Sequence, residues 1–107
     1  MRSLRLIKAK IAYAYARLKA DSLAGISGRR QFVLMTDGGK LVVMDKSLFY
    51  RMRKRGSMPK NITPRMLPSI AVYYTKGTHN AHSVPPMTKP TADGRRQRYL
   101  KYVSSLS

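Results

Sequence analysis

The chain of 107 residues is long enough for one domain with a modest core, and its 22 lysines and arginines against 4 aspartates give a formal net charge of +18. A chain with this charge repels itself unless a polyanion offsets it, so nucleic acid is the first expected partner and an anionic membrane surface the second. The absence of cysteine excludes disulfides, thiol nucleophiles and cysteine–zinc sites, no apolar run is long enough to span a bilayer, and a hydrophobic fraction of 43% is too high for a wholly disordered basic tail.

Arg2–Lys19 is predicted to form a basic amphipathic helix within an N-terminal segment, 1–24. Its large apolar side chains fall within an arc of roughly 100°, which is the usual width of a core-facing stripe. The stripe contains Leu4, Ile7, Ile11, Ala14, Tyr15 and Leu18. We therefore expect it to pack on the core, with Leu6 and Tyr13 left exposed. A transit peptide or a helix lying on a membrane surface would show a similar pattern, and both interpretations rank below the core-packed helix.

A β-hairpin is predicted after the connection at 21–30. Gln31–Thr36 and Lys40–Met44 are β-prone runs separated by Asp37-Gly38-Gly39, whose glycines supply the positive φ that a tight turn needs. Both strands are apolar on both faces, so both faces should be covered. The flanking helices can cover one face, and we expect the other to meet a partner.

The stretch 45–60 is predicted to begin with a short basic helix. Asp45 is a suitable N-cap, Gly56 a suitable stop, and Pro59 prevents continuation. The apolar side of this helix carries Leu48, Phe49 and Met52. The opposite side carries Tyr50, Arg51, Arg53 and Lys54, with Arg55 at the border.

A second helix start is predicted at Thr63-Pro64, but Pro68 should limit it to about one turn. Ile70–Thr75 is β-prone and predicts a third strand. Residues 29–75 are therefore expected to form a strand–strand–helix–strand core. The predicted fold class is α+β, with the N-terminal helix bracing a small three-stranded sheet.

Residues 76–92 are expected to form an extended arm, because they contain Gly77 and three prolines and show no periodicity. Such an arm usually becomes ordered against another molecule, so we expect 76–92 to contact other protein chains of an assembly. Asp93-Gly94 should then cap a last basic helix, 95–104, within the segment 93–107. Its apolar side carries Tyr99, Leu100, Tyr102, Val103 and Leu106, and its polar side carries Gln97, Arg98 and Lys101.

The sequence offers little for catalysis. Asp37 is explained by a turn and Asp45 and Asp93 by caps, so no pair of acids remains for acid–base chemistry. His79 and His82 have a spacing that can meet a metal, but no third ligand is near them. We expect no enzymatic activity, cofactor, metal or small-molecule substrate.

Basic clusters with interleaved tyrosines carry the functional prediction. Guanidinium forks bind phosphates, and tyrosines can stack on unpaired bases. The stacking candidates are Tyr50, Tyr73, Tyr74, Tyr99 and Tyr102. No base-reading motif is visible, so sequence-specific readout is not expected. The predicted nucleic-acid-binding residues are Arg29, Arg30, Tyr50, Arg51, Arg53, Lys54, Arg55, Lys60, Arg95, Arg96, Arg98 and Lys101.

The segment 48–60, Leu-Phe-Tyr-Arg-Met-Arg-Lys-Arg-Gly-Ser-Met-Pro-Lys, together with the apolar hairpin before it, resembles small uncharacterised basic proteins of bacteriophages that infect gut Bacteroides-type hosts, including small single-stranded DNA phages. The resemblance covers about a third of the chain and contains no diagnostic functional motif. It implies an accessory or virion protein that acts near the phage genome, and it assigns no functional residue.

The sequence thus favours a non-enzymatic protein that binds DNA or RNA with little sequence preference inside a phage virion or another nucleoprotein. Two alternatives remain open. One is a structural protein that docks on an acidic capsid or ribosomal neighbour. The other is a small DNA-binding regulator whose 45–55 helix enters a major groove. A virion or cytoplasmic location is expected, neither secreted nor transmembrane, and a membrane is not the expected partner.

Overall fold

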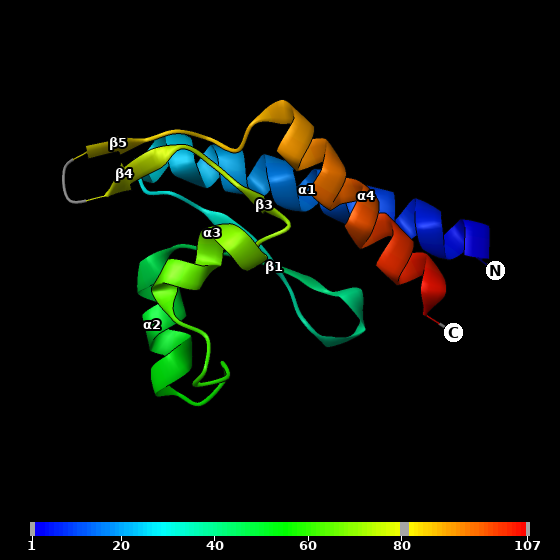
Figure 1. Ribbon diagram of the computed structural model, residues 1–107, viewed down its shortest axis with the longest axis horizontal. Helices are drawn as coiled ribbons and strands as arrows, with labels where there is room; N and C mark the ends of the chain where they lie inside the picture. The colour runs from blue at the N-terminus through cyan, green and yellow to red at the C-terminus, as the bar shows by residue number, and fades with distance from the viewer. Residues whose placement is uncertain (1, 80–81, 107) are drawn as a thin grey trace.

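The computed structural model describes residues 2–79 and 82–106, with the side chains of 4–36, 38–78 and 82–106 (Figure 1). Four α-helices, five short strands and two 3₁₀ turns follow one another along the described chain. They are α1 (Arg2–Ser27), β1 (Phe32–Met35), η1 (Asp37–Gly39), β2 (Leu41–Met44), α2 (Lys46–Lys54), η2 (Pro64–Met66), α3 (Leu67–Ile70), β3 (Tyr73–Tyr74), β4 (Gly77–His79), β5 (His82–Val84) and α4 (Lys89–Ser105).

The predicted hairpin and three-stranded sheet are present. The strand order is β2-β1-β3, and β1 is antiparallel to both neighbours, pairing Phe32 with Met44 on one side and with Tyr74 on the other. Gly38 and Gly39 adopt φ values of 80° and 81°, so the turn uses the left-handed region that glycine adopts without strain. The third strand is shorter than predicted, because only Tyr73–Tyr74 of the 70–75 run form it.

Helices of the same chain cover both faces of the sheet. The expectation that one face of the hairpin would contact a partner is therefore wrong. Val33 points into a cluster with α1 and α4, whereas Phe32 and Leu34 point into a second cluster with α2 and α3. Alternate residues of one strand thus enter two cores. In Figure 1, α1 and α4 lie on one side of β1 and α2 and α3 on the other. The molecule is a three-layer arrangement.

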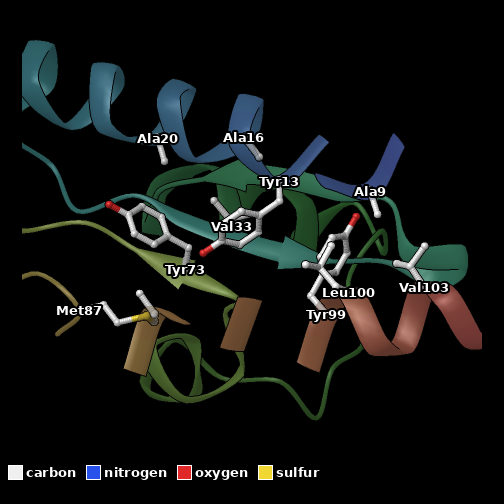
Figure 2. Packing of buried hydrophobic residues seen from close by; sticks show 11 residues of the cluster. Ala9, Tyr13, Ala16, Ala20, Val33, Tyr73, Met87, Tyr99, Leu100 and Val103 are labelled. Atoms are coloured by element: carbon white, nitrogen blue, oxygen red, sulfur yellow. The ribbon is translucent and has the colours of Figure 1, made fainter. Parts of the chain in front are cut away.

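Helix α1 is longer than predicted and presents the opposite side to the core. Ala9, Tyr13, Ala16 and Ala20 are buried, and Figure 2 shows them directed toward Val33 and Tyr99. The stripe predicted to be core-facing is exposed, with Tyr15 68% accessible where Tyr13 is 2% accessible. The alanines explain the reversal, since small side chains let a helix backbone approach a sheet and a second helix closely. Leu6, expected to be exposed, is partly buried.

The segment predicted as a structureless arm has structure of its own. Strands β4 and β5 pair as an antiparallel hairpin, and Thr78 bridges to Arg29 at the start of the core. Met87 is buried in the cluster between α1 and α4. The description of 76–92 as an arm that cannot order itself is therefore wrong for the described residues. Contact of this segment with another chain stays a prediction, and Ala81 within it lies outside the described residues.

Two prolines lie in first turns of helices: Pro68, which was predicted to limit a helix, and Pro90, which was predicted to belong to the extended arm. Helix α4 begins at Lys89 with Thr88 as N-cap residue and Pro90 in its first turn, and α3 likewise holds Pro68 in its first turn. The first turn tolerates proline because its N–H groups have no partner within the helix. Asp93 is consequently inside α4 and caps nothing. The apolar side of α4 was predicted correctly for Tyr99, Leu100 and Val103, which are buried.

Candidate nucleic-acid interface

Helix α2 is built by the local signals in its sequence. The Asp45 backbone is extended, and its Oδ1 accepts a 2.8 Å hydrogen bond from the Leu48 amide, which makes Asp45 the predicted N-cap. Gly56 follows the helix with φ 80°, and its amide donates to the Arg53 carbonyl at 3.1 Å. Phe49 is fully buried and anchors the apolar side of the helix on the second core cluster.

The opposite side of α2 carries exposed cations and one ring. We call Tyr50, Arg51, Lys54 and Arg55 the α2 basic face, and all four are exposed. Tyr50 is 54% accessible and meets Phe49 edge to face, with centroids 6.1 Å apart. Arg51 and Lys54 lie in the last turn of the helix and Arg55 is its C-cap residue, where the helix dipole stabilises positive charge.

Arg53 has a different role from its neighbours. It is half-buried, and its Nη2 donates a 3.0 Å hydrogen bond to the carbonyl of Lys60. This bond folds the loop that follows α2 back onto the helix. The backbone of Lys60 is therefore held against Arg53 of α2, and the Lys60 side chain is exposed.

The Arg29-Arg30 pair divides into one exposed and one structural side chain. The Arg29 side chain is 63% accessible and lies 3.6 Å from Asp45 Oδ2. Arg30 Nε donates to the Thr75 carbonyl at 3.0 Å and its Nη2 to the Pro85 carbonyl at 2.9 Å. Burial lowers the pKa of Arg30, although the Tyr74 ring beneath it opposes the shift.

A pocket of about 420 Å³ opens where α2 begins. Arg29, Arg30 and Lys46 contribute to its lining, and so does Asp45. The carboxylate of Asp45 opposes the binding of a phosphate in this pocket, whereas the three cations of the lining favour it. Lys46 was not among the predicted residues, because its position beside Arg29 depends on the packing of α2 against the 29–30 segment.

The third basic cluster is also divided. Arg95 Nη1 donates to the carbonyls of Pro68 and Ala71 at 2.6 and 2.7 Å, and the Arg96 guanidinium lies 5.9 Å from the Tyr13 ring centroid. Both are half-buried, and Arg95 joins α4 to the turn before β3. Arg98 and Lys101 are exposed and remain available to a partner.

Most of the candidate stacking tyrosines belong to the interior. Burial, reinforced by a hydrogen bond to the Asp21 carboxylate, raises the pKa of Tyr73 to about 12, and burial also raises the pKa of Tyr99. The Tyr74 ring lies 4.2 Å from the Arg30 guanidinium and 5.7 Å from that of Arg95. Tyr50 and Tyr102 are the two candidates with substantial exposure, so stacking on bases is expected from these two alone.

The candidate residues thus sort into two groups. Arg30, Arg53, Arg95 and Arg96 make contacts within the molecule, although the sequence placed them with the phosphate-binding residues. The exposed group is Arg29, Tyr50, Arg51, Lys54, Arg55, Lys60, Arg98 and Lys101.

No family model, curated protein or solved structure matches this chain. Among the described side chains, no three histidine, cysteine, aspartate or glutamate residues come together as a metal site; His79, whose spacing from His82 was noted in the sequence, lies outside that set. Within 2–79 and 82–106, no helix has both the length and the hydropathy needed to cross a membrane.

Proposed function

We propose that this protein is a non-enzymatic, sequence-tolerant nucleic-acid-binding component of a larger assembly. The observation that carries the proposal is the α2 basic face, on which three exposed cations and an exposed ring share one side of a helix whose other side is anchored in the core. The anchoring matters because a rigid helix presents its charges without an ordering cost at the moment of binding.

The charge balance supports a polyanion as partner. Four aspartates can pair with at most four of the 22 lysines and arginines, which leaves at least 18 cations to be neutralised from outside. Asp21 is engaged by Tyr73, and Asp45 is engaged at the start of α2. A phosphate backbone supplies the missing negative charge at regular spacing, and the counterions that it releases supply most of the binding free energy.

The placement of the exposed cations supports binding without sequence preference. The exposed cations lie on surfaces that can follow a backbone, and Tyr50 can stack on any base because every base has a π-face. The resemblance of the 48–60 segment to small phage proteins supports a virion or other nucleoprotein as the assembly. Arg51, Lys54 and Arg55 of the α2 basic face act as phosphate contacts, and the exposed residues Arg29, Lys60, Arg98 and Lys101 are further candidate contacts.

Fluorescence anisotropy with labelled random single-stranded and duplex DNA and RNA tests the proposal. The triple variant Arg51→Ala, Lys54→Ala, Arg55→Ala should weaken binding to all four probes by a similar factor. The matched control is Lys8→Ala, Lys10→Ala, Lys19→Ala, which removes the same charge from exposed positions of α1. Equal losses in both triple variants would mean that net charge alone is responsible and would reject the α2 basic face as the site.

A further inference from the structure

Helix α1 exposes a row of large apolar side chains that the fold does not use. Leu4, Ile7, Ile11, Tyr15 and Leu18 are each between 53% and 68% accessible, and we call them the α1 apolar stripe. At 100° per residue they fall within one arc of about 80°, and the centre of that arc lies about 180° from the centre of the buried positions. The stripe therefore points directly away from the core, and no described part of the chain covers it.

The stripe has the dimensions of a binding element. It spans 4–18, which corresponds to about 21 Å of helix axis. Scattered apolar residues on a surface are ordinary, but a contiguous row along a helix marks an interaction surface. An exposed apolar row lowers the solubility of a protein. We therefore expect another molecule to cover the α1 apolar stripe.

The charges beside the stripe indicate what that occupant is. Exposed Lys8 and Lys19 flank one side, and exposed Lys10 lies toward the other. Residues 2–20 contain no acid at all. The first acid of the helix, Asp21, accepts a hydrogen bond from Tyr73 at 2.7 Å and so faces the sheet.

We propose that α1 lies in the surface of an anionic lipid bilayer, with the α1 apolar stripe inserted between headgroups and the flanking lysines against lipid phosphates. A helix with an apolar row, a basic border and no acids has the features of an in-plane membrane helix. Tyr15 fits the interface because its ring is apolar and its hydroxyl reaches water. The sequence assigned this stripe to the core, which argued against a membrane; the exposure of the stripe removes that argument.

A second copy of the chain fits the stripe less well. Two α1 helices packed through their stripes would place rows of lysine from both copies side by side, and each copy carries a net charge of +18. An anionic bilayer offers hydrocarbon and negative charge together. The two sides of the molecule are also compatible with simultaneous binding, since α1 and α2 cover opposite faces of the sheet (Figure 1).

The chain contains no tryptophan, so a single introduced tryptophan reports on insertion. Tyr15→Trp places the probe in the stripe, and Tyr50→Trp places a matched probe on the α2 basic face. Both positions are exposed in the free protein. The full-length, nucleic-acid-free variants are titrated with phosphatidylcholine vesicles that contain about one third phosphatidylglycerol, with pure phosphatidylcholine vesicles, and with vesicles that contain brominated acyl chains.

The expected result is a blue shift of the Tyr15→Trp emission and its quenching by brominated chains, with anionic vesicles only, while Tyr50→Trp changes little. Ile7→Gln, Ile11→Gln should weaken vesicle binding roughly tenfold or more, because two inserted side chains are lost while the charge is unchanged. The control Ala12→Gln, at an exposed position of α1 outside the stripe, should bind as the parent does.

Three results would overturn the proposal. Vesicle binding without quenching of Tyr15→Trp would indicate adsorption by charge alone. Equal shifts of both probes would indicate unfolding on the vesicle. A blue shift of Tyr15→Trp that rises with protein concentration in the absence of lipid would assign the stripe to a second copy of the chain.

Discussion

The hydroxyl of Tyr73 donates a 2.7 Å hydrogen bond to Oδ1 of Asp21, which connects β3 to α1 across the first core cluster. Tyr73 is buried, whereas Asp21 is exposed on its other side. Burial and this bond raise the pKa of Tyr73 to about 12. Burial favours the neutral, protonated form of the Tyr73 hydroxyl. The folded state therefore holds this proton more tightly than the unfolded state does.

Folding stability should therefore depend on Tyr73 at alkaline pH. The contribution of Tyr73 is complete below its unfolded pKa of about 10 and is lost as the pH rises through about 12. Tyr73→Phe removes the hydrogen bond to Asp21 and should lower the free energy of unfolding by about 1 kcal/mol near neutral pH. The loss is no larger because the exposed Asp21 carboxylate can bind water instead. The difference in unfolding free energy between parent and variant, measured by denaturant titration, should shrink between pH 10 and 12. A constant difference across that range would show that the tyrosine proton is not coupled to folding.

The cap of α2 is tested by Asp45→Ala. The substitution removes the acceptor of the Leu48 amide bond and the partner of Arg29, and it should cost about 1 kcal/mol of stability. Asp93→Ala is the control, because Asp93 is an exposed residue inside α4 and should cost less than about 0.5 kcal/mol. Equal effects of the two substitutions on the denaturant midpoint would argue against the cap.

Two arginines of α4 separate stability from binding. Arg95→Ala removes the donor to the carbonyls of Pro68 and Ala71 and should cost about 1–3 kcal/mol. Arg98→Ala should change stability by less than about 0.5 kcal/mol and should weaken nucleic-acid binding. Thermal unfolding and anisotropy on the same samples check both statements. An Arg95→Ala variant as stable as the parent would contradict the stabilising role of these two hydrogen bonds.

The attachment of the β4–β5 hairpin is tested by Gly77→Ala. A Cβ at this position meets the backbone of Arg30, so either the hairpin or the 29–30 segment must move, at a cost of about 1–3 kcal/mol. Gly25→Ala is the control, because no atom lies near that Cβ and α1 should gain about 0.5–1 kcal/mol. Hydrogen exchange should show faster exchange at 77–79 and 82–84 in the first variant only. Unchanged protection there would contradict the packing of Gly77 on Arg30.

The elements with local signals were predictable from the sequence. The Asp-Gly-Gly turn, the Asp45 cap and the Gly56 stop each depend on residues within a few positions, and all three are present. The apolar side of α2 followed from helical spacing for the same reason. Predicting these features needs no information about contacts with distant segments of the chain.

The remaining features depend on contacts between distant segments. The prediction of which side of α1 faces the core was wrong. Hydrophobicity alone favoured burial of Ile11 and Tyr15, whereas close packing on β1 and α4 buries the small side chains of Ala16 and Ala20. Arg30 and Arg95 looked like phosphate ligands because their shared contact with Tyr74 is not visible along the sequence. For the same reason, four of the twelve candidate residues turn out to make contacts within the molecule, and the other eight are exposed.

The salt dependence of nucleic-acid binding tests the central claim most directly. If about 6 to 10 phosphates are neutralised, the affinity for random single-stranded and duplex probes should fall by about 10³ to 10⁵ between 50 and 200 mM salt. Each of Arg51→Ala and Arg55→Ala should reduce the slope of log affinity against log salt by about one, with little change in melting temperature. Arg30→Lys, at a structural position, should leave the slope unchanged. A flat salt response on all probes, or one duplex sequence preferred by a large factor, would contradict binding by phosphate neutralisation.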